Sequence, residues 1–234
     1  MRTCIVFLIY LVLGGPLCAQ VPKSSYHVPN NSDVTKTISF GDRYLFETFR
    51  KGIVYLRTGG RAESLLNYSF FHGEIQFIDA KKDTLLLADG QLVSRIVIDD
   101  MVFFAVPEHG HIQQIAVFDK IRLGRKQKLF IADTQHQGAF GGYSSTSSIS
   151  TYSTYTDARG HMQRLNPGSN VIMRKGITYF WIDQNQRFYP ANKANLLKIF
   201  PKKRREINEY FHANKVNFLN ETEVIKLLEF CQDF

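Results

Sequence analysis

The sequence predicts an α+β protein in which an antiparallel β-meander, or a sheet curled like a barrel, precedes a small helical subdomain at the C-terminus. Two observations predict this fold class. From residue 37 to about residue 130, short apolar or alternating runs are bounded by Gly, Asp and Lys, which is the pattern of strands joined by turns. After residue 191 the apolar residues take up helical spacing. Because no helix is expected between the strands, consecutive strands join by short turns and pair antiparallel.

The β-rich domain is expected over residues 37–190. Its predicted strands up to residue 118 are Tyr44–Phe49, Ile53–Leu56, Leu65–Phe70, Glu74–Ile78, Thr84–Leu87, Val93–Ile98, Met101–Val106 and His111–Phe118. Asp99-Asp100 separates two of these runs by two residues, which is the spacing of a β-hairpin. Two more strands are expected at Asn170–Arg174 and Ile177–Ile182, with Lys175-Gly176 as the turn between them.

Residues 135–159 differ in composition from the strands on either side. Gly, Ser, Thr and Tyr dominate this segment, and its apolar content is low. One interpretation is a long surface loop that has no core to bury. The other is a loop that contacts a ligand, since serine, tyrosine and glycine make adaptable polar contacts.

The segment 191–234 is predicted to be helical. Asn192 can cap a short helix, and Pro201 is allowed only in the first turn of the next one. Asn220 and Glu223 have the spacing of a capping box at the start of the last helix. The apolar residues expected to be buried are Ile207, Tyr210 and Phe211 on one helix and Val224, Leu227, Leu228 and Cys231 on the last.

Residues 1–19 show the features of a secretory signal peptide in the expected order along the chain. Arg2 precedes an apolar run from Cys4 to Leu13, Gly14–Pro16 breaks any helix, and a small residue, Ala19, stands before polar Gln20. Cleavage after Ala19 is therefore expected, with the mature protein exported to the periplasm or the cell surface.

Cleavage after Ala19 has two alternatives, a membrane anchor and a lipidated cysteine, and a flexible leader is expected after the cleavage point. A membrane anchor needs about 20 apolar residues, more than this run supplies. Lipid attachment at Cys18 needs a small residue directly before the cysteine, where Leu17 stands. Residues 20–36 are polar and contain two prolines, which predicts a flexible leader.

The net charge limits the classes of binding partner, and the cysteine content limits the possible disulfides. The chain has a formal net charge of +8, which suits anionic lipid headgroups, an anionic glycan or another envelope protein, although a basic soluble surface is the simpler interpretation. No nucleic acid is expected. Once the signal peptide is removed only Cys231 remains, so an intramolecular disulfide is impossible and the core alone must stabilise the fold.

Three segments carry a resemblance to a known group of proteins. They are the strand block ending in LNYSFFHGEIQF (within residues 65–77), the GAFGGYSSTSS segment (138–148) and the helical tail from LLKIFPKKRREINEYF to NFLNETEVIKLLEF. Together with the Ala-Gln junction after the signal, they resemble an uncharacterised family of exported envelope proteins of Bacteroidota. The resemblance covers most of residues 40–234. It implies export but supplies no activity, cofactor or catalytic residue.

The best candidate for a metal site is Glu108-His109-Gly110-His111. Two histidines at this spacing on a strand point the same way, and His72 or Glu74 is a possible third ligand. The alternative is a solvated hairpin turn, because Pro107 precedes the group and Gly110 lies within it.

No catalytic, cofactor-binding or metal-binding residue can be assigned. The sequence has no G-x-S-x-G elbow, P-loop, dinucleotide fingerprint or EF-hand loop, and Cys231 lies on an apolar stripe where an inert, buried thiol is expected. Carboxylates that could serve a glycosidase are Glu47, Glu63, Glu74, Asp99 and Asp100, with nothing to choose between them. The expected function is a non-catalytic binding or scaffolding module; the alternative is a periplasmic hydrolase acting on glycan or peptide.

Two further short motifs stand out in the sequence. Lys202–Arg205 is the densest run of charge, and it can either contact an anionic partner or form a solvated helix face. Asp83-Thr84-Leu85 resembles the acceptor motif for O-glycosylation in Bacteroidota envelope proteins.

Overall fold

The computed structural model describes residues 25–29, 32–87, 91–137, 143–146, 169–232 and 234. The predicted signal peptide at residues 1–19, including Cys18 and the cleavage point after Ala19, lies outside the described residues. Within the part of the chain that is described, no helix combines the length and the apolar character needed to cross a bilayer.

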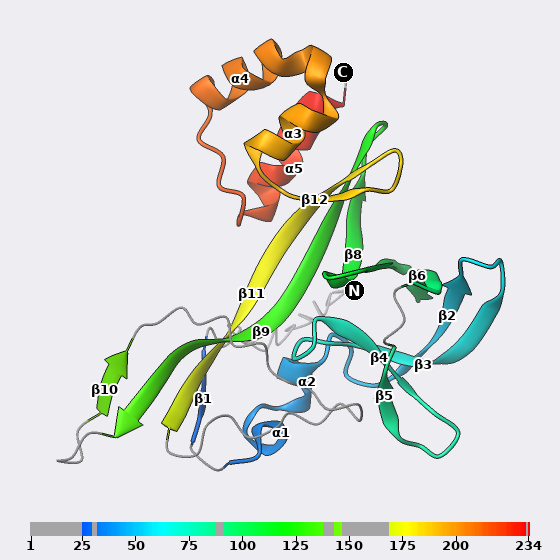
Figure 1. The fold of residues 1–234 in the computed structure, drawn as a ribbon, viewed down its shortest axis with the longest axis vertical. Helices are drawn as coiled ribbons and strands as arrows, with labels where there is room; N and C mark the ends of the chain where they lie inside the picture. The colour runs from blue at the N-terminus through cyan, green and yellow to red at the C-terminus, as the bar shows by residue number, and fades with distance from the viewer. Residues whose placement is uncertain (1–24, 30–31, 88–90, 138–142, 147–168, 233) are drawn as a thin grey trace, which may run out of the picture.

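The described strands form one antiparallel sheet. They are β1 (Tyr26–Val28), β2 (Arg50–Leu56), β3 (Arg61–Ser69), β4 (Glu74–Ile78), β5 (Thr84–Leu86), β6 (Val93–Ile98), β7 (Met101–Val106), β8 (Gly110–Val117), β9 (Ile121–Gln137), β10 (Tyr143–Thr146), β11 (Ser169–Asp183) and β12 (Phe188–Pro190). Their order is β1-β11-β9-β8-β7-β6-β2-β3-β4-β5, with β10 paired to β9 and β12 to β11. The predicted antiparallel meander is therefore confirmed, and the sheet is open at both edges (Figure 1).

The sheet curls so that the turn between β3 and β4 packs against β8 and β9. His111 N–H donates to the Gly73 carbonyl at 3.2 Å, and Leu129 N–H donates to the Phe70 carbonyl at 2.6 Å. The concave side encloses a core that includes Ile38, Leu66, Ile75, Ile96, Ile98, Phe103, Leu129 and Met173. Burying each such side chain stabilises the fold by about 1.5–3 kcal/mol, before the loss of conformational entropy is counted.

Two predicted turns have different outcomes. Asp99 and Asp100 connect β6 to β7, and Asp99 takes φ 53°, so the predicted hairpin is confirmed. The turn predicted at Lys175-Gly176 is wrong, because β11 runs straight through it and Gly176 pairs with Lys128 of β9. A Cβ at Gly176 would lie 2.8 Å from a ring carbon of Phe130, so the glycine makes room for a neighbouring aromatic ring.

The predicted leader at residues 20–36 is ordered where the structure describes it, which corrects the prediction for residues 25–29 and 32–36. Strand β1 pairs with β11, burying Tyr26 and Val28 on either side of exposed His27. The short helix α1 (Val34–Thr37) follows, capped by the Asp33 side chain, and α2 (Phe40–Arg43) comes next. A strand of three residues is too short for its alternation to stand out in the sequence, and its partner lies far along the chain.

The loop predicted at residues 135–159 also needs correction in part. Residues 135–137 form the end of β9, and β10 pairs with them antiparallel. The remainder of the segment, 138–142 and 147–159, lies outside the described residues.

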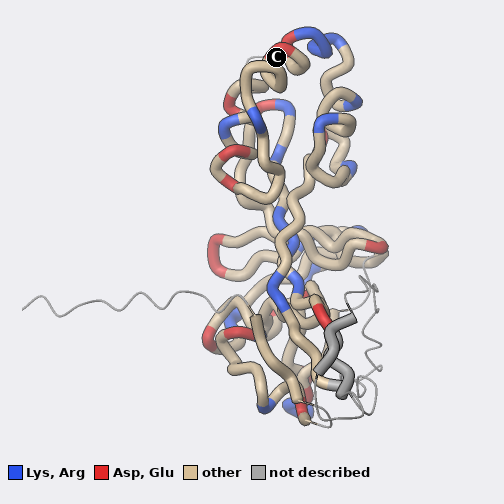
Figure 2. The backbone as a smooth tube through the Cα atoms, turned by 90° about the vertical axis from the view of Figure 1, so that its left-hand side faces the viewer, with Lys and Arg blue, Asp and Glu red and all other residues tan. Residues whose placement is uncertain are grey.

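The C-terminal segment forms helices α3 (Lys193–Ile199), α4 (Arg204–Ala213) and α5 (Glu221–Cys231), with a 3₁₀ turn, η1 (Pro201–Lys203), before α4. These helices cover the upper ends of β8, β9 and β11 in Figure 1, and Figure 2 shows a narrow waist between them and the curled part of the sheet. Their core joins strand residues to helix residues: Ile121, Leu123, Tyr179 and Trp181 pack with Leu196, Ile207, Val224, Leu227, Leu228 and Cys231.

The predicted helix caps and apolar stripe are confirmed. Asn192 accepts a hydrogen bond from Asn195 N–H at 2.8 Å, and Asn220 accepts from Thr222 N–H at 3.1 Å. Glu223 departs from the expected capping box in one respect, because its carboxylate accepts from Asn217 N–H at 2.7 Å. Val224, Leu227, Leu228, Cys231 and Ile207 are buried as predicted, whereas Tyr210 and Phe211 are only half-buried.

Candidate functional site

The residues of the candidate metal site have separate environments. His111 is 3% exposed, and its Nδ1 accepts a hydrogen bond from Ile75 N–H at 3.2 Å. Burial, reinforced by the charge of Lys126, lowers the pKa of His111 to about 4. The His109 ring instead packs on Phe180, with 5.1 Å between the ring centroids. Across the described chain, no three His, Cys, Asp or Glu side chains lie close enough together to hold a metal ion.

The side chains that could act as nucleophiles, Ser69 and Cys231, are buried. Ser69 Oγ lies 2.9 Å from Nδ1 of His72, but Ser69 is 1% exposed, so no substrate can reach the hydroxyl. Cys231 is buried as predicted, and burial raises the pKa of its thiol to about 12, which keeps it protonated.

The candidate carboxylates are spread over the sheet end. Glu47 and Asp100 are exposed, and Asp99 forms an ion pair with Arg50. Glu63 is exposed on β3, and Glu74 begins β4, where burial raises the pKa of its carboxyl. Apart from the adjacent Asp99 and Asp100 in one turn, the structure places these side chains on different strands and turns.

The feature that most resembles a binding site is a groove between the end of β2 and the turn that joins β11 to β12. Two adjoining hollows, of about 550 and 320 Å³, share Ser94, Phe104 and Gln186. We call them together the arginine groove. Its polar and aromatic lining comprises Tyr55, Arg57, Ser94, Arg95, Phe104, Gln114, Arg122, Gln184, Asn185, Gln186 and Phe188.

A β-bulge places the near wall of the groove. Tyr55 of β2 pairs with Arg95 of β6, but the next residue, Leu56, pairs with Val93, so Ser94 is an extra residue in β6. The Ser94 hydroxyl donates to the Tyr55 carbonyl at 2.9 Å, which holds the bulge in place. The bulge thereby turns Ser94 toward the groove, where it lines both hollows.

The three arginines of the groove have no carboxylate partner among the described residues. Neither hollow has an acidic residue in its described lining, and none of the described carboxylates forms an ion pair with Arg57, Arg95 or Arg122. Arg95 instead lies over the Tyr55 ring, its guanidinium carbon 4.5 Å from the ring centroid. A stacked guanidinium keeps its N–H edge free, so these side chains can still donate to a ligand.

Arg122 is positioned from two sides. Its guanidinium carbon lies 5.9 Å from the centroid of the Phe104 ring, and its Nη1 donates to Oε1 of Gln114 at 3.5 Å. Phe104 is supported in turn by Phe188 of β12, with 5.6 Å between the ring centroids. The aromatic pair forms an apolar base from which the cation faces the groove.

The far wall of the groove presents side-chain amides on a fixed turn. Asp183 Oδ1 accepts from Asn185 N–H at 2.9 Å and from Arg187 N–H at 2.8 Å. Gln186 takes φ 57°, in the left-handed region. Gln184, Asn185 and Gln186 therefore line the groove from a defined backbone, and their amides can both donate and accept hydrogen bonds.

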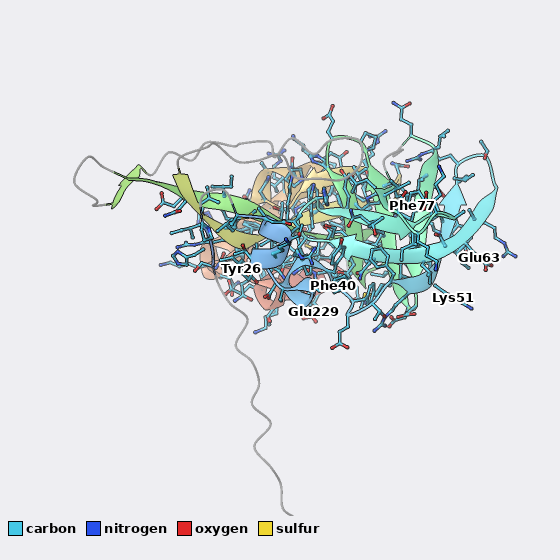
Figure 3. The ribbon with its side chains drawn as sticks, turned by 90° about the horizontal axis from the view of Figure 1, so that it is seen from below. Tyr26, Phe40, Lys51, Glu63, Phe77 and Glu229 are labelled. Atoms are coloured by element: carbon cyan, nitrogen blue, oxygen red, sulfur yellow. The ribbon has the colours of Figure 1, made fainter. Side chains whose placement is uncertain are left out.

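A third hollow, of about 570 Å³, lies beside the core of the curled sheet. We call it the apolar hollow. Most of its lining is apolar: Val54, Leu56, Leu66, Phe77, Ile78, Leu87, Leu92 and Val93. Glu63, Ser64 and Asp79 are its polar members. Figure 3 labels Phe77 and Glu63, which lie on the side of the molecule away from Tyr26.

Sequence reasoning did not single out the groove residues. Arg57, Arg95 and Arg122 are isolated cations in separate strand segments, and only the register of the sheet brings them to one place. The dense run Lys202–Arg205 lies instead at the helical end, near the top of Figure 2. Two of its members pair with carboxylates of α4: Lys203, at the end of η1, with Glu206 at 3.5 Å, and Arg205 with Glu209 at 3.7 Å. Of the proposed glycosylation motif, Thr84 and Leu85 lie in β5.

Comparison with known proteins gives no further guide. No protein-family model matches the chain, and neither a curated protein nor a solved structure shows significant similarity to it.

Proposed function

We propose that this is an exported envelope protein that acts as a non-catalytic binding module, and that the arginine groove takes an anionic ligand. The observation that carries the proposal is a set of three arginines that pair with no described carboxylate, in a groove whose described lining is free of acidic residues. A guanidinium presents N–H donors in a planar fork that matches carboxylate and phosphate groups. The ligand class is therefore a molecule that carries phosphate or carboxylate groups.

The rest of the groove favours a ligand that also has hydroxyl groups. The amides of Gln114, Gln184 and Gln186 can donate and accept hydrogen bonds at once, as recognition of a hydroxyl requires. Each hydrogen bond to a charged group contributes about 1.5–3 kcal/mol. The formal charge of +8 favours the approach of such a ligand from a distance.

The absence of acidic residues from the described lining speaks against the alternative of a glycan hydrolase at this groove, because glycoside hydrolysis ordinarily uses two carboxylates that flank the scissile bond.

Export and membership of the exported Bacteroidota family remain part of the proposal. They rest on the residues at positions 1–20 and on the three segments that resemble that family. Mass spectrometry of protein from its native envelope tests export: a mature chain that starts at Gln20 supports it, and an uncleaved chain or a lipidated Cys18 contradicts it.

Calorimetric titration tests the groove. The probes are glycerol phosphate and a galacturonate oligosaccharide, with a neutral dextran oligosaccharide as the control ligand. We expect Arg95→Gln and Arg122→Gln each to weaken binding of the anionic probes about tenfold, which corresponds to about 1.4 kcal/mol. Arg174→Gln, in an exposed position of β11 where it pairs with Phe130 of β9, outside the lining, is the matched control and leaves binding unchanged. Equal losses in all three variants, or no binding of either anionic probe by the wild type, would contradict the proposal.

A further inference from the structure

The arginine groove and the apolar hollow meet at the rim formed by the end of β2 and the start of β6. Leu56 lines both of them. Tyr55 pairs with Arg95, and both line the groove, whereas Leu56 pairs with Val93, and both line the hollow. The bulge at Ser94 thus separates the arginine groove from the apolar hollow, and the two surfaces begin at successive residue pairs.

The same rim brings a cation and an exposed leucine together. The backbone N–H of Arg57 donates a hydrogen bond to the backbone carbonyl of Leu92 at 2.8 Å. Arg57 lines the groove, and Leu92, which is 55% exposed, lines the hollow. A molecule with a charged end and an apolar end could therefore contact both surfaces without crossing a polar barrier.

We infer that the ligand of the groove is an anionic amphiphile. Its aliphatic chain lies in the apolar hollow, and its phosphate or carboxylate group crosses the rim at Leu56 to reach Arg57 and Arg95. This inference rests on the proposed function, because it assumes that the groove binds an anion.

The volume and the lining of the hollow fit an aliphatic chain. A volume of about 570 Å³ lies within the range of about 300–1,000 Å³ found for small-molecule sites. Val54, Leu66 and Val93 belong to the buried core of the sheet, while Leu56, Phe77 and Leu87 are only partly buried. A chain in the hollow would cover the exposed leucine and extend the core, and each buried methylene raises affinity about fourfold.

The charges around the hollow fix the direction of the chain. Glu63 and Asp79 are the carboxylates of its lining, and they repel an anionic head group. Asp79 is held in place because its Oδ1 accepts from Lys81 N–H at 2.9 Å and from Asp83 N–H at 2.8 Å. The head group must therefore leave the hollow past Leu56, where the lining of the adjoining groove supplies the arginines.

A series of n-alkyl phosphates from butyl to decyl, titrated below their micelle concentrations, tests the inference. We expect affinity to rise about fourfold for each added methylene until the hollow is filled. Leu92→Asn should flatten this dependence and leave butyl phosphate binding nearly unchanged. Leu65→Asn is the matched control, because Leu65 is 41% exposed on β3 but lies outside the lining, and it should keep the full dependence. Arg95→Gln should weaken every member of the series by the same factor.

The outcomes separate the inference from the proposed function. Binding that needs Arg95 but does not change with chain length overturns the inference and leaves the anion groove standing. Binding that rises with chain length but is unaffected by Arg95→Gln overturns the proposed function, and with it the inference. No binding of any member of the series overturns both.

Discussion

The two ends of the molecule bury their apolar side chains in different ways. At the helical end, α3, α4 and α5 close over the strands, so Leu123, Trp181, Val224, Leu227 and Leu228 are all 0% exposed. At the sheet end the curled strands enclose a core but leave the apolar hollow beside it, with Leu92 more than half exposed. The helical end therefore closes its core over the strands, whereas the surface that we propose for a ligand lies at the sheet end.

The largest effect is expected from a charge placed in the closed core. Leu228→Asp puts a carboxylate in a site that is 0% exposed and lies within an apolar cluster, so α5 should detach or the group should stay protonated. Truncation of the same side chain, Leu228→Ala, should lower the free energy of unfolding by about 2–5 kcal/mol. Thermal melts and urea denaturation measure both changes.

The control for Leu228 is Leu219, which is 71% exposed between α4 and α5. Leu219→Asp should leave the melting temperature within the range of ordinary surface substitutions. An unchanged melting temperature for Leu228→Asp would mean that α5 does not depend on this core, and the contrast between the two ends would fail.

A smaller effect is expected at the sheet end, from His111. Its folded pKa of about 4 lies below the ordinary value of 6.5, so the neutral form stabilises the fold. This stabilisation is fully present above pH 6.5 and is lost as the pH falls toward 4, with a total loss of about 3 kcal/mol. Urea denaturation at pH 7 and pH 4.5 should therefore show a larger drop for the wild type than for His111→Gln. Equal drops in the two proteins would show that His111 does not couple the fold to pH.

Two glycines of the sheet should differ in how much an added methyl group lowers the stability of the fold. A Cβ at Gly52 of β2 would lie 2.7 Å from the Val97 carbonyl oxygen and 2.7 Å from Leu66, so backbone and core would both have to shift. At Gly176 the obstacle is the ring of Phe130, an exposed side chain that can move away. We expect Gly52→Ala to cost about 1–3 kcal/mol and Gly176→Ala less than about 1 kcal/mol. Chemical denaturation of both variants checks the order, and the reverse order would contradict the packing described here.

The helical end could be predicted from sequence because its signals are local. Asn220 and Glu223 stand three residues apart, and the stripe from Val224 to Cys231 fits within one short helix. The sheet could be predicted only as a class. Lys175-Gly176 between two apolar runs has the pattern of a turn, yet it lies within β11 because β9 is long enough to pair along its whole length.

The candidate site could not be predicted for the same physical reason. Arg57 and Arg95 come together through the pairing of β2 with β6, which joins residues about forty positions apart, and the bulge at Ser94 shifts the register there. Arg122 reaches the same groove through the successive pairings of β6, β7, β8 and β9. The residues with a visible local pattern led elsewhere: His109 and His111 have separate contacts, and Lys202–Arg205 lies at the other end of the molecule. Local patterns report local structure, whereas this groove is a property of strand register.

The smallest effect is expected from the charge run at the helical end. Arg204 begins α4, where the positive end of the helix dipole disfavours a cation, and no ion pair joins it to a described carboxylate. Arg204→Glu should therefore raise the free energy of unfolding by about 0.3–1 kcal/mol at low salt, and the gain should shrink as salt screens the interaction. Arg205→Glu is the informative partner variant, because it also removes the pair with Glu209 and should gain less. Neither variant should change binding of an anionic probe to the arginine groove. If Arg204→Glu weakens that binding as much as Arg95→Gln does, the anion is held at the helical end, and the division of roles between the two ends is wrong.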